Sequence, residues 1–204
     1  DPLADGPVIQ HSSSVAISNG MTIRKLFEQL QDFRKEIHIP VVLMGYMNAV
    51  LQYGFEKFCA DAAAAGVDGL ILPDLPEYEF ETMYRSMIEQ HGLDFTFLVT
   101  PETSAERVQQ LDRLSSGFLY AVSSSATTGS EGQPADLTNY LGQLREMHLK
   151  NPILVGFGIR DKASFEAVCQ LADGGIIGSA YIRALENSKD VNASTKTFLS
   201  SIRG

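Results

Sequence analysis

The feature that most constrains the fold of this chain is a regular alternation of short apolar runs with amphipathic helical runs. The apolar runs recur at intervals of roughly 20 to 35 residues, and stripes at helical spacing lie between them. This order predicts successive βαβ units around a parallel sheet whose strands are covered on both faces. The expected strands are Ile39–Tyr46, Asp68–Pro73, Asp94–Thr100, Gly117–Val122, Pro152–Phe157 and Gly174–Ile177.

The helical runs carry recognisable start and stop signals. The first helix is predicted from about Thr22 to Glu36, after a polar loop at the start of the chain. Gly66 is placed to close an Ala-rich helix that begins near Phe55, because glycine adopts the left-handed conformation of a helix C-terminus. Thr103 and Glu106 have the spacing of a capping box, which predicts that Thr103 opens the next helix.

The number of elements limits the architecture to two choices. Six strands could form an open sheet, or they could belong to a TIM (β/α)8 barrel, typically of about 250 residues, that lacks about its first two strands and first helix here. Glycine-rich ends of successive strands favour the barrel. No linker or second core is visible, so residues 1–204 are predicted to form one N-terminally incomplete domain. As the whole molecule it would leave strand Ile39–Tyr46 as an unpaired apolar edge, and we expect it to be unstable.

Composition restricts the partners. With 44% apolar residues, 20% charged residues and a net charge of −9, the chain resembles an ordinary globular protein. An acidic chain without a basic run is poorly suited to nucleic acid or anionic membranes, and no stretch approaches the roughly 18 apolar residues of a membrane span. Cys59 and Cys169 lie far apart without metal-ligand spacing, which predicts no metal site and fits a cytoplasmic location.

Three glycine-containing loops follow the last three predicted strands. Glycine lets backbone N–H groups approach a phosphate closely, and a helix N-terminus adds unpaired donors. A tight turn would explain each loop alone equally well. Three such loops in consecutive units, at the usual phosphate position of a barrel, favour a phosphate cradle. Their residues are Thr128 and Gly129, then Gly156, Phe157 and Gly158, then Gly178 and Ser179.

Two further groups could face the same mouth. The front loop carries Asp1 and Asp5 between prolines and is followed by Ile9, so it is either a simple turn or a loop projecting over the mouth. Tyr46, Tyr120 and Phe157 stand near strand ends, where they could fill the barrel interior, stack on a flat apolar substrate, or do both. No histidine stands near the Ser run at 123–125, which argues against a serine nucleophile.

Several motifs together resemble one family, the alpha chain of tryptophan synthase. They are DPLADGP with the following Ile9, MGYMN (Met44–Asn48), LILPDLP (Leu70–Pro76), ATTGSEG, GFGI and GSA, in that family's order and spacing. The resemblance implies a cytoplasmic lyase of tryptophan biosynthesis. It would cleave indole-3-glycerol phosphate to indole and glyceraldehyde 3-phosphate by a retro-aldol step, with no cofactor in this chain.

The resemblance also implies roles for individual residues. The reaction requires protonation of indole C3, stabilisation of the resulting cationic ring at its N–H, and loss of a proton from the glycerol hydroxyl. Asp5 matches the acid near the ring nitrogen, and Tyr120 matches the tyrosine near the reacting atoms. The proton-transfer glutamate would lie upstream of Asp1, so the chain as given is expected to be inactive. The implied substrate-binding residues are Ile9, Tyr46, Thr128, Gly129, Phe157, Gly158, Gly178 and Ser179.

The implied partner is the beta chain, which holds pyridoxal phosphate and receives indole. Asp1, Asn48 and Pro76 match positions that face it in an alpha-beta-beta-alpha assembly. One departure concerns loop closure, because Ser124 occupies a position where many members have arginine.

Two other functions remain open from the sequence. The chain could be a non-catalytic partner that binds the phosphate ligand and regulates another protein, as the missing glutamate and Ser124 would allow. It could also be another phosphate-binding barrel enzyme, but such enzymes would need a lysine or a different acid pair, and the strand ends offer only Asp74.

Overall fold

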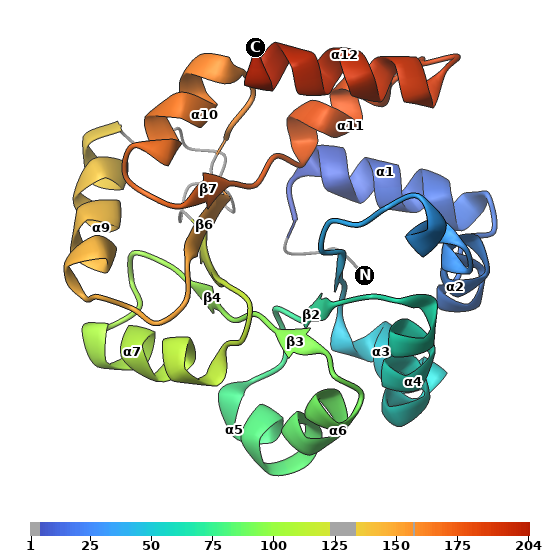
Figure 1. Cartoon of the computed structure of the whole chain (residues 1–204), viewed down its shortest axis with the longest axis horizontal. Coiled ribbons are helices and arrows are strands. Elements are labelled where there is room, and N and C mark those ends of the chain that lie inside the picture. The colour runs from blue at the N-terminus through green and yellow to red at the C-terminus, as the bar shows by residue number, and fades with distance from the viewer. Residues whose placement is uncertain (1–4, 123–133, 157) are drawn as a thin grey trace.

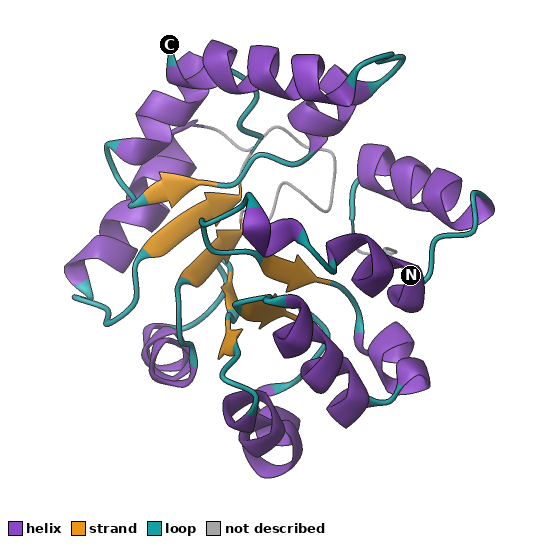
Figure 2. Ribbon diagram, turned by 45° about the vertical axis from the view of Figure 1, so that its right-hand side comes forward, coloured by secondary structure: helices purple, strands orange, loops and turns teal. Residues whose placement is uncertain are grey.

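The computed structural model describes residues 5–122, 134–156 and 158–204. All of its strand pairs are parallel, and neighbours in the sheet are also neighbours in sequence. Helices surround the strands (Figures 1 and 2). Each predicted run contains strand structure, but most strands are shorter than expected, and the run Asp94–Thr100 contains two of them. The strands are β1 (Val42–Met44), β2 (Gly69–Ile71), β3 (Asp94–Phe95), β4 (Leu98–Val99), β5 (Leu119–Val122), β6 (Ile153–Gly156) and β7 (Gly174–Gly175).

The expected continuous strand over Asp94–Thr100 was wrong, because the run changes partners halfway. Its first part, β3, pairs with β2, and its second part, β4, pairs with β5. Side-chain hydroxyls replace ladder partners along this run: Ser116 accepts from the Phe95 N–H at 3.0 Å and Ser115 accepts from the Phe97 N–H at 3.1 Å. The seven strands therefore form two ladders, of three and four strands, that meet at this point.

The described strands form an arc in which β1 and β7 do not pair with each other. Helix α1 (Pro7–Ser18) instead packs against α11 (Ser179–Leu185) across the space between these strands (Figure 1). An all-parallel sheet with an outer layer of helices is the α/β arrangement of a TIM barrel. That two strands and one helix are missing from the front stays a prediction.

Helix α1 is a correction to the sequence analysis, which placed the whole segment before Thr22 in a loop. Gly6 caps the helix with an extended backbone, and Pro7 stands in the first turn, where the missing N–H costs nothing. The serine-rich sequence HSSSVAIS has weak helix propensity, and no residue of α1 is fully buried. Contacts with α11 therefore supply stabilisation that the local sequence does not predict.

Two helix boundaries also differ from expectation. The helix predicted from Thr22 to Glu36 is capped by Thr22 but ends early, as α2 (Ile23–Leu30) followed by the 3-10 turn η1 (Phe33–Lys35). The predicted capping box was wrong, because Ser104 rather than Thr103 caps α7 (Ala105–Leu114). The Thr103 hydroxyl instead accepts from the Thr100 N–H at 3.0 Å within the preceding turn.

The remaining helices occupy the positions that βα units require. Gly66 ends the Ala-rich helix with φ +92°, as predicted. One helical segment after β2 contains a π-helical turn, η2, between two α-helical parts. The bounds are α3 (Met47–Tyr53), α4 (Phe55–Ala65), α5 (Glu77–Glu79), η2 (Phe80–Tyr84), α6 (Arg85–Gln90), α9 (Pro134–Glu146), α10 (Lys162–Cys169) and α12 (Val191–Arg203).

The core lies between the sheet and these helices. Phe80, Phe95 and Phe97 form an aromatic cluster with ring centroids 4.6 to 5.0 Å apart. Strand residues such as Leu119 and Val155 are fully buried beside them. Burial of such side chains stabilises each by roughly 1.5–3 kcal/mol and fixes the strands whose ends carry the polar groups described below.

Hydrogen-bond networks lie at the amino ends of the strands. Asp112, which is 4% exposed, accepts from the Lys150 N–H at 2.7 Å and from the Asn151 N–H at 3.0 Å. Asp68 accepts from the Val41 N–H at 2.6 Å and from the Arg34 guanidinium, which also donates to the Gly66 carbonyl at 2.7 Å. These bonds tie helix ends to strand starts.

Candidate functional site

The carboxyl ends of the strands carry the groups that the sequence singled out. In parallel sheets these ends lie on one side, so residues that are distant in sequence meet there. Tyr46 follows β1, Asp74 follows β2, and Tyr120 lies within β5. Gly158 follows β6 and Gly178 follows β7, and these two loops are neighbours because β6 pairs with β7.

Asp5 and Tyr46 form the first contact of the site. The Tyr46 hydroxyl donates to Asp5 Oδ2 at 2.8 Å across 41 positions of sequence. Burial, the hydrogen bond to Asp5 and the charges of Asp5 and Asp74 raise the pKa of Tyr46, so its phenol stays protonated and remains a donor. Gln10 Nε2 donates to the Asp5 carbonyl at 2.7 Å and thereby holds Asp5 to the first turns of α1.

Asp74 fixes the turn that carries Tyr46. Both carboxylate oxygens of Asp74 lie 3.0 Å from the Met47 backbone N–H, in the first turn of α3. An acid at this position satisfies an otherwise unpaired helix N–H. The contact also joins the segment of Asn48 to the segment of Pro76, two exposed positions that the resemblance assigns to the partner surface.

The Tyr120 side chain packs against a glycine on the neighbouring strand, β6. A Cβ atom built on Gly156 would lie 2.3 Å from the Tyr120 ring and hydroxyl, so only glycine leaves room for this side chain. Burial, with a further contribution from the negative charge of Asp5, raises the pKa of Tyr120. The same acid therefore influences both tyrosines, which supports one site shared by Asp5, Tyr46 and Tyr120.

The last two loops bring backbone N–H groups to the same edge. Gly158 has φ +42°, a conformation that favours glycine. Gly178 precedes α11, and Ser179 is the first residue of that helix. A Cβ atom built on Gly178 would lie 3.7 Å from Ile9 Cδ1, so α1 brings Ile9 to this loop. Asp1, Thr128, Gly129 and Phe157, and the departure at Ser124, lie outside the described residues.

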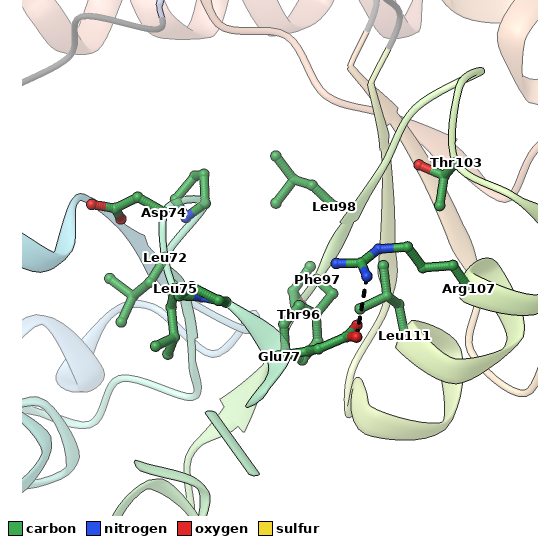
Figure 3. Close-up of a pocket in the computed structure, with 12 residues that line it drawn as sticks. Leu72, Asp74, Leu75, Glu77, Thr96, Phe97, Leu98, Thr103, Arg107 and Leu111 are labelled. Atoms are coloured by element: carbon green, nitrogen blue, oxygen red, sulfur yellow. Dashed lines mark hydrogen bonds and ion pairs between the residues drawn. The ribbon is translucent and has the colours of Figure 1, made fainter. Parts of the chain in front are cut away.

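A cavity of about 210 Å³ lies between the loop after β2, which carries Asp74, and the start of α7 (Figure 3). Glu77 and Arg107 line it and are in direct contact, with Arg107 donating to Glu77 Oε1 at 3.1 Å. Neither residue was predicted from the sequence, nor was the positioning role of Asp74. The only signal was an acid directly after Pro76, as is common at the start of a helix.

The described residues contain neither a membrane-spanning helix nor a metal-binding cluster. No helix in the described part of the chain is long and apolar enough to cross a membrane. Within residues 5–122, 134–156 and 158–204, no cluster of three His, Cys, Asp or Glu side chains could hold a metal ion.

Comparison with known proteins gives a consistent result. A family model described as the tryptophan synthase alpha chain matches residues 1–202. A tryptophan synthase alpha chain of Bacteroides thetaiotaomicron is 47% identical over 191 residues, which cover 93% of this chain and 75% of that protein. One from Flavobacterium psychrophilum is 50% identical over 186 residues, covering 91% and 74%.

Solved structures share the fold over nearly the whole chain. Tryptophan synthase subunit alpha of Legionella pneumophila superposes with a TM-score of 0.88 at 36% identity, covering 100% of this chain and 76% of that one. A tryptophan synthase A-subunit from the hyperthermophile Pyrococcus furiosus superposes with a TM-score of 0.87 at 31% identity, covering 99% and 82%. Both comparisons confirm the predicted fold class.

Proposed function

Because the chain belongs to the tryptophan synthase alpha chain family, we propose that it cleaves indole-3-glycerol phosphate to indole and glyceraldehyde 3-phosphate. The observation that carries the proposal is the hydrogen bond of 2.8 Å between Tyr46 and Asp5 at the carboxyl edge of the sheet. This bond would hold a carboxylate where positive charge develops on the indole ring, near the half-buried Tyr120.

The carboxylate of Asp5 has a defined chemical task. When indole C3 gains a proton, positive charge spreads to the ring nitrogen, and a nearby carboxylate favours that state over the neutral substrate. Tyr46 orients Asp5 because its protonated phenol donates to one carboxylate oxygen. The glutamate that would move the protons belongs, by the family pattern, upstream of Asp1. We therefore expect the chain as given to release no indole.

Substrate binding divides into an apolar end and a phosphate end. Ile9, Tyr46 and Phe157 would contact the indole ring, and Tyr120 would line the pocket near the reacting atoms. The backbone N–H groups of Gly158, Gly178 and Ser179, together with Gly129, would hold the phosphate, since glycine loops and a helix start bind anions without lysine. Thr128 would help to close the site over Asp5.

The partner would be the beta chain of the same enzyme, in an alpha-beta-beta-alpha assembly in the cytoplasm. Asp1, Asn48 and Pro76 would face it, and its pyridoxal phosphate would act on the indole that this chain releases. The reaction of the alpha chain itself would need no cofactor. The contact of Asp74 with the Met47 N–H supports this surface, because it holds the segments of Asn48 and Pro76 together.

The test is an indole-release assay on indole-3-glycerol phosphate. It compares the 204-residue chain with the same chain extended by the segment that precedes the matching motif in the Flavobacterium relative. The extended chain should release indole, and beta chain should accelerate the release. In the extended chain, Asp5→Asn should lower kcat by about 10²- to 10³-fold, because the amide cannot stabilise the cation.

The matched control is Asp190→Asn, which removes a carboxylate from an exposed helix cap far along the chain and should leave turnover unchanged. An extended chain that binds indole-3-glycerol phosphate without cleaving it would contradict the lyase proposal. That result would favour the non-catalytic regulatory partner instead.

A further inference from the structure

Two aspartates bind backbone N–H groups at opposite ends of the β1–β2 strand pair. At the amino end, Asp68 accepts from the Val41 N–H at 2.6 Å. At the carboxyl end, both oxygens of Asp74 lie 3.0 Å from the Met47 N–H. Each bond joins residues that are 27 positions apart. The two bonds are alike in chemistry and in the strands they connect, but only Asp74 lies at the edge where the site forms.

Tyr46 directly precedes the N–H that Asp74 binds. Its backbone is extended, with φ −122° and ψ 146°, and α3 begins at the next residue. The peptide unit between Tyr46 and Met47 is planar, so a bond to the Met47 N–H fixes the orientation of that whole plane. Met47 is also 8% exposed and packs in the core. Asp74 thereby sets the direction in which the Tyr46 side chain leaves the backbone.

The far end of the Tyr46 side chain reaches the acid that the proposed reaction uses. Its hydroxyl donates to Asp5 Oδ2 at 2.8 Å. Gln10 donates to the backbone carbonyl of Asp5, so that bond holds the main chain rather than the carboxylate. The orientation of the Asp5 carboxylate therefore depends on where the Tyr46 hydroxyl lies.

The direction of the Asp74 side chain favours a role in holding the backbone. Asp74 lines the cavity after β2, but its carboxylate points away from Glu77 and Arg107 (Figure 3). Both of its oxygens are instead within bonding distance of one N–H at the start of α3. The bonds of this acid thus lead towards Tyr46 and not towards the charged pair of the cavity.

We propose that Asp74 is a positioning residue for the proposed lyase reaction, which acts through Tyr46 on the carboxylate of Asp5. This inference rests on the proposed function, because Asp5 has a chemical task only in that reaction. Asp74 itself contacts neither the substrate nor the reacting atoms. A displaced Asp5 carboxylate would stabilise the developing cation less well, so the effect belongs in kcat and not in KM.

Two variants of the extended chain separate the position of the Asp74 oxygens from their charge. Asp74→Asn keeps an acceptor at the same place and removes the charge, and its kcat should stay within about twofold of the unaltered chain. Asp74→Glu keeps the charge but moves the oxygens by one methylene, and should lower kcat about fivefold at unchanged KM. Because Asp74 is exposed, neither side chain has to enter a packed core. Steady-state indole release measures both constants.

The matched control is Asp68→Glu, which makes the same change in the other aspartate of the strand pair. It should lower stability in urea denaturation and leave kcat within about twofold, because the amino ends of the strands lie far from the reacting groups. A double-mutant cycle then tests the route through the tyrosine. In a Tyr46→Phe background, Asp74→Glu should cost less than about twofold more, because the hydroxyl through which it acts is absent.

The possible failures can be told apart. Unchanged kcat in Asp74→Glu overturns this inference alone, and so does a larger loss in Asp74→Asn than in Asp74→Glu, which would assign the effect to charge. A fivefold loss that persists in the Tyr46→Phe background would show that Asp74 does not act through Tyr46. An equal fall in kcat for Asp68→Glu would reduce the effect to loosening of the strand pair. No indole release by the unaltered extended chain overturns the proposed function, and this inference with it.

Discussion

The acidic side chains at the two ends of the sheet differ in how many hydrogen bonds they accept. At the amino ends, Asp112 and Asp68 each accept more than one hydrogen bond, and backbone N–H groups are among the donors. At the carboxyl ends, Asp5 is held by the Tyr46 hydroxyl, and Glu77 keeps one buried oxygen without a partner in the described part of the chain. Acids with several donors stabilise the fold, whereas Asp5, with one hydroxyl donor to its carboxylate, can still interact with a bound molecule.

This difference matches a general property of such barrels, in which stability and chemistry occupy opposite ends. The polar groups at the amino ends arise from short local connections, such as Asn151 two positions before β6. The acids at the carboxyl ends come from loops far apart in sequence, for example Asp5 and Tyr46. Substitutions at the amino ends should therefore mainly lower stability, and substitutions at the carboxyl ends should mainly lower activity.

The largest expected effect is on stability at the amino end. Asp112→Ala removes the acceptor of the Lys150 and Asn151 N–H groups in a buried place, and should lower the free energy of unfolding by about 3 kcal/mol. Urea denaturation measures this loss. Glu106→Ala, at an exposed position of the same helix, should cost less than about 1 kcal/mol. A loss below about 1 kcal/mol for Asp112→Ala would break the comparison.

The next effect combines packing with activity at the carboxyl end. Gly156→Ala would place a Cβ atom 2.3 Å from the Tyr120 ring and force the ring out of its seat. We expect a loss of about 2 kcal/mol of stability and, in the extended chain, a fall in kcat of about 30-fold. Gly142→Ala is the matched control, because nothing lies within 4 Å of its Cβ position in α9 and alanine favours a helix. Unchanged indole release by Gly156→Ala would exclude Tyr120 from the site.

A smaller effect tests the orientation of Asp5. In the extended chain, Tyr46→Phe removes the donor to Asp5 Oδ2 and should lower kcat/KM about tenfold with little change in stability. Tyr53→Phe is the control, because the Tyr53 hydroxyl donates to Asp61 on the outer helices and its loss should not affect turnover. Steady-state assays of both variants decide the matter. Equal activity of the two would show that Tyr46 does not orient the carboxylate.

The smallest effect concerns a buried phenol and its dependence on pH. The Tyr140 hydroxyl is buried without a hydrogen-bond partner in the described ranges, and burial raises its pKa above the ordinary value of 10.0. The unfolded chain ionises near pH 10 while the folded chain does not, so stability is lost as pH rises above 10. Tyr140→Phe removes the unpaired hydroxyl and should raise the free energy of unfolding by about 1 kcal/mol near neutral pH. It also removes the loss of stability that ionisation of Tyr140 causes above pH 10.

Urea denaturation at pH 8 and at pH 10.5 tests this expectation. The advantage of Tyr140→Phe over the unaltered chain should grow between these two values. A variant that loses stability at pH 8 would show that the hydroxyl has a partner outside the described residues.

The sequence predicts the elements better than the contacts between them. Apolar periodicity located every strand run, because burial on both faces of a sheet requires such runs. It missed α1, whose serine-rich sequence forms a helix beside α11, and it missed the change of partners between β3 and β4. Both depend on segments far away in the chain, which local propensity does not record.

In the site, too, the sequence predicts the individual residues better than the contacts between them. The front loop and the glycine-containing strand ends were visible as motifs, so Asp5, Gly158 and Gly178 could be named. Their assigned roles stay predictions. The positioning contact of Asp74 with Met47 and the Glu77–Arg107 pair were not visible, because each joins loops through a geometry that only the folded sheet creates.

The packing of α1 on α11 has a consequence for the order of folding. Ile9 and Gly178 are about 170 positions apart, so their contact closes a very long loop, and the entropic cost of closure rises with the logarithm of loop length. We expect the βα units to form first and α1 to dock last. Since α1 also anchors Asp5, its detachment would abolish the site while the core stayed folded. Amide hydrogen exchange should then be faster in α1 than in the strands.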